Sequence, residues 1–289
     1  MAKLSIVILN YNTKDVLLDC LGSIVANTSD LDYEIVVVDN GSSDGSVEAV
    51  KKLGIKNLKI AENTTNLGFA AGNNTARKIV GGDYVLMLNS DTLVNKSTLK
   101  ETVSYIESHK DVGALGCKIL LPDGTLDKDS RRSFPTPWVA FTHFSGIDRL
   151  FPKSKLFAKY WYWNRDENET HEADVLQGAF TLVRKKVLDE VGWYDEDYFL
   201  DGEDIDLCWK IKEKGWRIVY FPKASIIHIK KVTKSKFKNL RNIMSGVESM
   251  EIFYKKRLWN RYPLIVNLLV LFGINVVRAI RYIKLLFNN

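Results

Sequence analysis

The chain has 289 residues, of which 46% are hydrophobic, so it is long enough for one large α/β domain or for one domain with a substantial appendage. Its three cysteines lie far apart in apolar surroundings, which excludes a disulfide framework and a cysteine metal site. The first residues do not resemble a signal peptide, because the apolar run after Lys3 is too short. We therefore expect a cytoplasmic protein with reduced cysteines.

The net charge of +6 conceals a strong asymmetry along the chain. From Lys210 onward there are 18 Lys or Arg residues against 3 Glu, a net charge of +15, whereas the preceding residues carry −9. A basic C-terminal part is typical of proteins that contact nucleic acid or an anionic membrane surface.

Short apolar runs rich in Val and Ile predict strands at 4–9, 33–40, 58–63 and 83–91. Helix-like stretches at 14–27, 43–53 and 70–80 lie between them. This alternation predicts an α/β fold with a mostly parallel sheet covered by helices on both faces.

Polar residues follow these strands, at the edge where parallel sheets bind their ligands. They are Asn10-Tyr11-Asn12, Asp39-Asn40 and Asn89-Ser90-Asp91, and three converging strand ends predict a pocket. Glycines in residues 66–74 allow close backbone approach to a ligand or a turn into a helix. Their spacing and position do not match a dinucleotide-binding fingerprint.

A second part runs from about Val112 to Tyr220. Residues 113–120 and 174–185 read as further strands, and 187–197 as a helix and a loop. Residues 127–170 are rich in aromatic and basic side chains with little periodicity, which predicts a mobile loop region or an acceptor-side insert.

An acidic cluster lies between the aromatic run ending at Phe199 and a helical pattern that includes Trp209. Such a cluster indicates a metal, a proton or a cationic partner, or else a solvated loop that caps the helix. Its four carboxylates belong to Asp201, Glu203, Asp204 and Asp206.

The last part begins with a basic run, Lys234, Lys236, Lys238 and Arg241, and reaches an uncharged stretch at 262–277. Its sixteen residues are fewer than the roughly 20 that a spanning helix needs. Basic residues flank it, so we expect an interfacial or re-entrant helix on an anionic leaflet. A core-packed helix or an oligomer contact is the alternative.

Seven stretches occur in an order that resembles the family 2 glycosyltransferases of the GT-A fold, over roughly residues 3–230. The resemblance is closest to a rhamnosyltransferase-like branch of bacterial polysaccharide assembly. The stretches are SIVILNYN, EIVVVDNGSSDGS, NLGFAAGNN, VLMLNSDT, LQGAFTLVRKKVLDEVGWYDEDYFL, EDIDLCWKIKEKGW and PKASIIH.

The resemblance implies a GT-A domain over 1–230, with a nucleotide-sugar half at about 1–111 and an acceptor half at about 112–230. Residues 231–289 would be a helical extension that associates with the membrane surface. The implied nucleotide-sugar contacts are Asn10, Tyr11, Asn12, Asp39, Asn66, Gly68, Asn89 and Ser90. Capping of the following helix is the alternative role for Asp39.

The resemblance also implies that Asp91 and His228 bind Mg²⁺ or Mn²⁺, which both suit oxygen ligands. Asn89 replaces the first acid of the family's metal motif, as in many members of this branch, which removes one carboxylate from the site. Without a metal, residues 89–91 would be a strand-end turn and His228 a satisfied core or surface group.

In the implied inverting reaction, Asp204 is the base that deprotonates the acceptor hydroxyl, and Glu203 is its helper or the alternative base. Asp201 and Asp206 would cap the helix or bind nearby basic groups. The implied acceptor contacts are Gln177, Gly178, Trp193, Arg131 and Arg132. The alternatives are a buried aromatic for Trp193 and solvated charge for the two arginines.

The function implied by the resemblance is transfer of a sugar, best rhamnose from dTDP-rhamnose, to a glycan on a polyprenyl diphosphate carrier. The expected location is the inner face of the plasma membrane, with an oligomer possible. The competing hypothesis is an inactive GT-A scaffold or glycan-binding subunit. Nucleic-acid binding is disfavoured, because the C-terminal lysines precede an apolar helix and are not interleaved with stacking aromatics.

Overall fold

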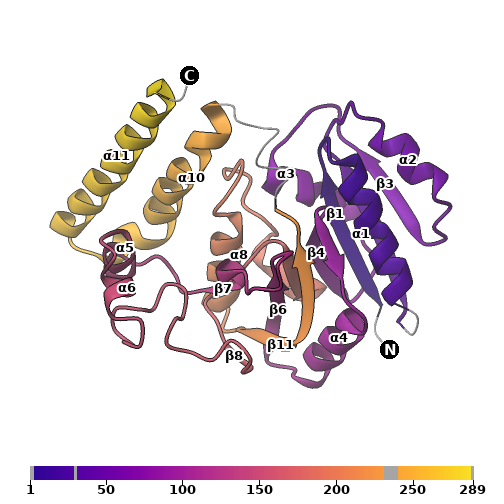
Figure 1. Cartoon of the computed structure of the whole chain (residues 1–289), viewed down its shortest axis with the longest axis horizontal. Helices are drawn as coiled ribbons and strands as arrows, with labels where there is room; N and C mark the ends of the chain where they lie inside the picture. Colours follow the sequence, from indigo (N-terminus) through magenta and orange to yellow (C-terminus); the bar gives the residue numbers. More distant parts are fainter. Residues whose placement is uncertain (1–2, 29–30, 231–239, 288–289) are drawn as a thin grey trace.

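The computed structural model describes residues 3–28, 31–230 and 240–287. One nine-stranded sheet, in the order β3-β2-β1-β4-β10-β6-β11-β5, runs through the molecule, and β8 pairs with β11 off this path. Figure 1 shows helices on both sides of this sheet and the C-terminal helices at the end away from β3.

The first half alternates strands and helices, as the sequence predicts, because each strand is a continuous apolar run that both faces of the sheet bury. Strand β1 pairs in parallel with β2 and β4, and β2 pairs in parallel with β3. The elements are β1 (Leu4–Asn10), α1 (Lys14–Asn27), β2 (Tyr33–Asp39), α2 (Ser46–Lys52), β3 (Leu58–Glu62), α3 (Phe69–Asn74), η1 (Thr75–Lys78) and β4 (Tyr84–Asn89).

In the second half, β10 runs antiparallel to both of its neighbours, β4 and β6, whereas β6 and β11 are parallel. The predicted strands at 113–120 and 174–185 are confirmed as β6 and as the pair β9 and β10. The elements are β5 (Thr92–Val94), α4 (Thr98–Ser108), β6 (Val112–Leu120), β9 (Val175–Leu176), β10 (Phe180–Arg184), α7 (Lys185–Val191), α8 (Glu203–Glu213) and β11 (Arg217–His228).

The region predicted to be a loop insert contains short elements of its own. Strand β7 pairs antiparallel with β9, and β9 in turn contacts α8. The region is therefore connected to α8 through β9. The elements are η2 (Lys128–Ser130), β7 (Arg131–Arg132), α5 (Pro137–Phe144), α6 (Ile147–Leu150) and β8 (His171–Glu172).

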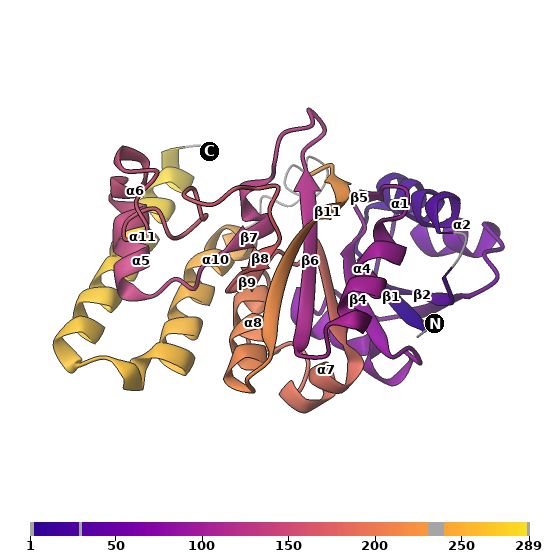
Figure 2. The same ribbon diagram turned by 90° about the horizontal axis from the view of Figure 1, so that it is seen from below.

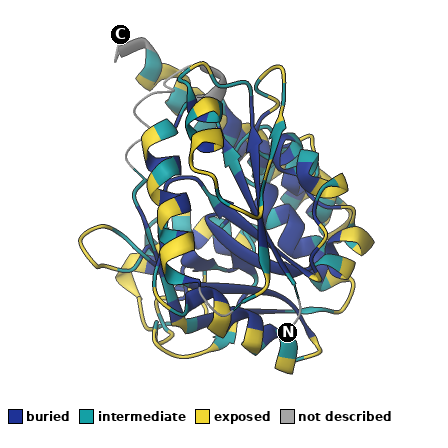
Figure 3. Cartoon of the chain, turned by 90° about the vertical axis from the view of Figure 1, so that its right-hand side faces the viewer, coloured by how far each residue is buried: buried dark blue, intermediate teal, exposed yellow. Residues whose placement is uncertain are grey.

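Two apolar clusters cover the two faces of the sheet. One contains residues of α1 and α4, and the other contains residues of α7 and α8. Figure 3 shows that the strands are buried along most of their length, with exposed residues on the outer faces of the helices. The expected α/β layering is therefore present.

The C-terminal extension packs on the domain through a third apolar cluster. Tyr198 and Trp209 of the domain contact this cluster together with Val247, Phe253 and Leu258 of the extension. Its elements are α10 (Leu240–Phe253), η3 (Tyr254–Leu258), η4 (Trp259–Arg261) and α11 (Leu264–Phe287).

Helix α11 is longer than the uncharged stretch at 262–277, which we expected to form an interfacial or re-entrant helix. Residues Leu264–Leu285 are long and apolar enough to cross a membrane, judged by length and composition alone. The basic run Lys234, Lys236 and Lys238 lies outside the described residues, as does the side chain of Arg241.

Candidate active site

The predicted strand ends meet at one edge of the sheet. Asn10 lies opposite Asp39 in the β1–β2 register, and Leu9 lies opposite Asn89 in the β1–β4 register. The Asn10 Nδ2 atom donates to Asp39 Oδ1 over 2.8 Å, and both side chains are buried. The ends of β1 and β2 are therefore joined directly through buried side chains.

The carboxylate of Asp39 organises the loop that follows β2. Its Oδ2 accepts from the backbone N–H of Ser42 over 2.8 Å. The Asn12 Oδ1 atom accepts from the N–H of Ser43 over 2.7 Å, and Asn12 has a positive φ of 53°. Tyr11, between Asn10 and Asn12 in the sequence, is half-buried. Asp39 therefore holds the turn after β2 and does not cap α2, whose N-cap is Gly45, so the alternative role of helix capping is wrong.

Asn66 and Gly68 join this edge to the acidic loop. Asn66 Oδ1 accepts from the Gly68 N–H and from Asn40 Nδ2, each over 2.9 Å. The next residue, Phe69, donates its N–H to the carbonyl of Phe199 over 2.7 Å. The turn at Gly68 therefore packs directly against the segment that leads into α8.

Asp91 and His228 are brought together by the pairing of β5 with β11, in which Thr92 lies opposite His228. The Nε2 atom of His228 is 3.1 Å from Asp91 Oδ1, and both side chains are buried. Ser90 Oγ lies 3.0 Å from Thr13 Oγ1 at the start of α1. Residues 137 positions apart thus form a pair of candidate metal ligands.

Asp127 is a buried residue of this site that the sequence analysis missed. Its Oδ2 lies 3.7 Å from His228 Nδ1, 2.7 Å from Lys230 Nζ and 3.1 Å from Gln177 Nε2. Burial lowers the pKa of His228, but the neighbouring carboxylates of Asp127 and Asp91 outweigh burial and leave that pKa raised. No local pattern marks Asp127, because its role depends on β11 and the 177–179 turn lying beside it.

The first turn of α8 contains Glu203, Asp204 and Asp206, all buried. Burial, together with the nearby charges of Asp204 and Asp201, raises the pKa of Glu203 well above its ordinary value. Asp206 accepts from Arg257 Nε over 2.7 Å, as expected of a carboxylate that binds a nearby basic group. These three carboxylates are therefore not solvated, whereas Asp201, which precedes the helix, is exposed.

Asp204 forms an ion pair with the Arg132 guanidinium, and both side chains are largely buried. Burial alone lowers the pKa of Arg132, but the charge of Asp204 and the contact with Tyr160 raise it above its ordinary value. A Cβ atom on Gly178 would lie 3.9 Å from the Cβ of Asp204. The candidate base thus lies between a cation and the glycine turn.

Two of the implied acceptor contacts do not face the site. Trp193 is fully buried in the core and donates its Nε1–H to Asp189 over 2.9 Å, so it is the buried aromatic of the alternative. Arg131 is buried with its guanidinium 4.8 Å from the Tyr220 ring centre. Because neighbouring residues of a strand point to opposite faces, Arg131 turns away while Arg132 reaches Asp204.

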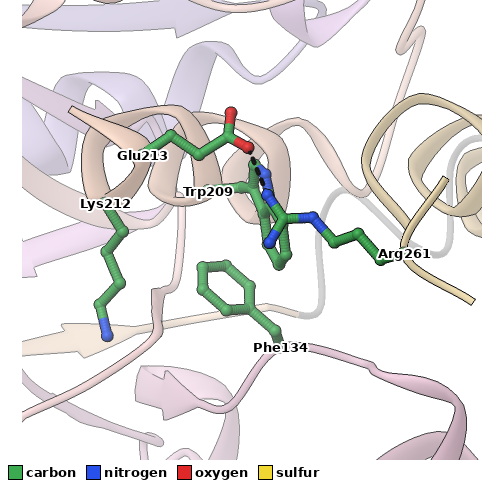
Figure 4. Close-up of a pocket in the computed structure, with 5 residues that line it drawn as sticks. All are labelled: Phe134, Trp209, Lys212, Glu213 and Arg261. Carbon is green, nitrogen blue, oxygen red and sulfur yellow. Dashed lines mark hydrogen bonds and ion pairs between the residues drawn. The ribbon is translucent and has the colours of Figure 1, made fainter. Parts of the chain in front are cut away.

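A cavity of about 590 Å³ lies on α8 outside this group. Figure 4 shows Arg261 beside the Trp209 ring and joined to Glu213, with Phe134 below. Its other cation, Lys212, is paired with Asp174 over 2.6 Å. None of its lining residues belongs to the predicted site.

The donor set of Asp91 and His228 fits a divalent ion that takes its other ligands from elsewhere. Among residues 3–28, 31–230 and 240–287, no three His, Cys, Asp or Glu side chains form a group that could hold a metal alone. Mg²⁺ and related ions are commonly held by one or two protein ligands plus phosphates and water.

The chain is similar in sequence to known glycosyltransferases. A sequence model of glycosyl transferase family 2 matches residues 5–192. The chain is 27% identical to the Mycobacterium tuberculosis N-acetylglucosaminyl-diphospho-decaprenol L-rhamnosyltransferase over 209 residues, which are 68% of this chain and 66% of that enzyme. It is 35% identical to the Bacillus spizizenii poly(ribitol-phosphate) beta-glucosyltransferase over 216 residues, 72% of this chain and 34% of that enzyme.

The fold is shared with GalNAc-T7, whose crystal structure was determined with UDP, GalNAc and Mn²⁺. The TM-score is 0.64 at 17% identity, over 89% of this chain and 49% of that one. The expected GT-A fold is thereby confirmed. Because the family model matches more than half of the chain, the chain belongs to glycosyl transferase family 2.

Proposed function

We propose that the chain is an inverting glycosyltransferase that moves a sugar from a nucleotide-sugar to a lipid-linked glycan during cell-surface polysaccharide synthesis. The observation that carries the proposal is the position of Asp204. This buried carboxylate lies at the start of α8, against Gly178. The name of the mycobacterial relative supports rhamnose as the sugar and a prenyl diphosphate as the carrier.

In this reaction Asp204 accepts the proton of the acceptor hydroxyl as that oxygen bonds to the anomeric carbon of the donor. The bond from that carbon to the diphosphate breaks in the same displacement, so the anomeric centre is inverted. The raised pKa of Glu203 favours its neutral form, so Asp204 is the better proton acceptor of the two. Arg132 has to release the Asp204 oxygen before a hydroxyl can occupy its place.

Asp91 and His228 would hold Mn²⁺ or Mg²⁺, with Asp127 orienting the imidazole from its other side. A bound ion would supply charge stabilisation for the departing nucleoside diphosphate. Asp39, Asn10 and the loop that they organise would bind the nucleoside. Tyr11, Asn12, Asn66, Gly68, Asn89 and Ser90 complete the proposed nucleotide-sugar contacts, and Gln177 and Gly178 the acceptor contacts.

We further propose that α11 associates with the inner face of the plasma membrane. Its outer side exposes large apolar residues from Leu264 to Ile283, including Leu268 and Phe272. The division of the chain at about residue 230 into a transferase domain and an extension is part of the same proposal. A lipid-linked acceptor would meet the enzyme at that surface.

The test is release of nucleoside diphosphate from a panel of nucleotide-sugars with Mn²⁺, for the wild type and three variants. Asp204→Asn should lower transfer about 10²–10⁴-fold. Asp91→Ala should weaken Mn²⁺ binding in titration calorimetry with the nucleoside diphosphate. Asp15→Asn removes an exposed carboxylate on α1 and should change neither quantity. Full activity of Asp204→Asn contradicts the assigned base, and no release from any donor or acceptor favours an inactive scaffold.

A further inference from the structure

The segment 137–163 presents unusually large apolar side chains to solvent. Three of them, Phe144, Leu150 and Leu156, are 59%, 74% and 58% exposed. Exposed residues of this size on one contiguous segment mark an interaction surface. The other large ones are Trp138, Phe141, Phe151 and Trp163.

The exposed charges of this segment are all positive. They belong to Arg149, Lys153, Lys155 and Lys159. Its one acid, Asp148, is buried, and its Oδ2 atom lies 2.8 Å from His143 Nδ1. No other acidic residue occurs between Ser130 and Arg165. The surface therefore combines apolar groups with a single sign of charge.

The segment is held in shape by its own contacts. The indole N–H of Trp138 donates to the carbonyl of Leu156 over 3.2 Å, and the Phe151 and Phe157 rings are 5.6 Å apart. Its end is tied back by the N–H of Ser133, which donates to the carbonyl of Tyr160 over 2.9 Å. The apolar side chains are thus displayed from an ordered base beside Arg132.

This chemistry selects an anionic bilayer surface from among the possible partners. Aromatic and aliphatic side chains interleaved with lysines bind the boundary between headgroups and acyl chains. A second copy of the same face would bring like charges together, which opposes self-association. The exposed aliphatic side chains of Leu150 and Leu156 would find no apolar group to contact on a phosphate backbone, which disfavours nucleic acid as the partner.

We propose that residues 137–163 form a second membrane contact, which inserts its apolar side chains into the interface of an anionic phospholipid bilayer. Figures 1 and 2 both place α5 and α6 at the same end of the molecule as α10 and α11. Two contacts at one end fix the orientation of the enzyme on the membrane, which one helix does not. The inference extends the membrane association proposed for α11 and needs no transferase activity.

The experiment is flotation of the full chain with vesicles of phosphatidylcholine alone or mixed with phosphatidylglycerol. Reversing the charges of Lys153, Lys155 and Lys159 to Glu should weaken binding to the mixed vesicles by about tenfold or more. Phe144→Ser with Phe151→Ser should weaken it similarly. The matched control reverses three exposed lysines outside this segment, Lys52, Lys56 and Lys78, and should bind like the wild type.

A second readout tests insertion directly. Vesicles with brominated acyl chains should quench tryptophan fluorescence, and Trp138→Phe with Trp163→Phe should remove most of that quenching. Unchanged quenching overturns the proposal. It is also overturned if only Leu268→Ser with Phe272→Ser in α11 abolishes flotation, or if the chain ignores vesicles and instead dimerises or binds DNA through this face. Donor hydrolysis without vesicles reports the proposed function separately, so the two can fail independently.

Discussion

Three carboxylates in the first turn of α8 have three different environments. Glu203 is buried with its Oε2 atom lacking a hydrogen-bond partner, and its pKa is raised. Asp204 faces Arg132, and Asp206 faces Arg257. Environments that differ in this way assign different roles to chemically similar groups. Asp204 also lies beside Gly178, where we propose that the acceptor binds.

We expect the ion pair with Arg132 to hold the Asp204 carboxylate in place until an acceptor binds. Replacement of Arg132 tests this expectation. Arg132→Gln retains a hydrogen-bond donor but removes the charge that holds the Asp204 oxygen. We expect donor hydrolysis by water to rise severalfold while transfer to the acceptor falls. Release of nucleoside diphosphate with and without acceptor measures both. Hydrolysis that falls to the level of Asp204→Asn would instead make Arg132 part of the donor site.

At the scale of elements, the turn before α3 and the segment before α8 depend on each other. Gly68 has a φ of +88°, and a Cβ there would lie 2.5 Å from the carbonyl oxygen of Phe199. Because that oxygen belongs to the backbone, a side-chain rotation cannot remove the clash. The close approach allows the N–H of Phe69 to donate to the same carbonyl, which joins the two halves of the site.

Gly68→Ala should therefore lower the free energy of unfolding by about 2 kcal/mol or more. The matched variant is Gly22→Ala within α1, where a Cβ would meet nothing within 4 Å. It should raise the free energy of unfolding by about 0.5–1 kcal/mol, because alanine is the better helix former. Urea unfolding of both variants checks the opposite signs. Equal effects would mean that the Gly68 turn relaxes away from Phe199.

At the scale of the whole molecule, the C-terminal extension supports the candidate active site. Ser249 of α10 donates its hydroxyl to the carbonyl of Asp201 over 2.5 Å, just before α8. Arg257 of η3 pairs with the fully buried Asp206 in the first turn of α8. The extension therefore holds the segment that contains Asp204, in addition to its proposed membrane role.

Truncation after Lys230 should destabilise the domain, even without a membrane. It removes the partners of Tyr198 and Trp209 and leaves the Asp206 carboxylate without Arg257. Arg257 is the closer of its two cations, at 2.7 Å against 3.8 Å for Lys210. The loss of a buried partner costs up to about 3–5 kcal/mol. We expect an insoluble or inactive product, measured by soluble yield and donor hydrolysis. Leu268→Ser with Phe272→Ser, on the exposed side of α11, should leave both unchanged; a stable, active truncation contradicts this account.

From the amino-acid sequence alone we could predict the alternating strands and helices, the polar strand ends and the family. These features are local, since a run such as Ile35–Val38 has to be buried whatever surrounds it, and a helix such as 14–27 follows from its own periodicity. The positions of Asn10 and Asp39 at one edge also followed, because parallel strands bring their ends together.

The directions of individual side chains, by contrast, depend on how the whole chain packs. Arg132 reaches Asp204 across 72 residues, Asp127 faces His228, and Trp193 is buried in the core. Each outcome depends on which elements pack side by side, and composition does not encode that. The exposed face of 137–163 has the same origin, since its aromatic residues could equally have filled a core. Packing left them at the surface with their lysines.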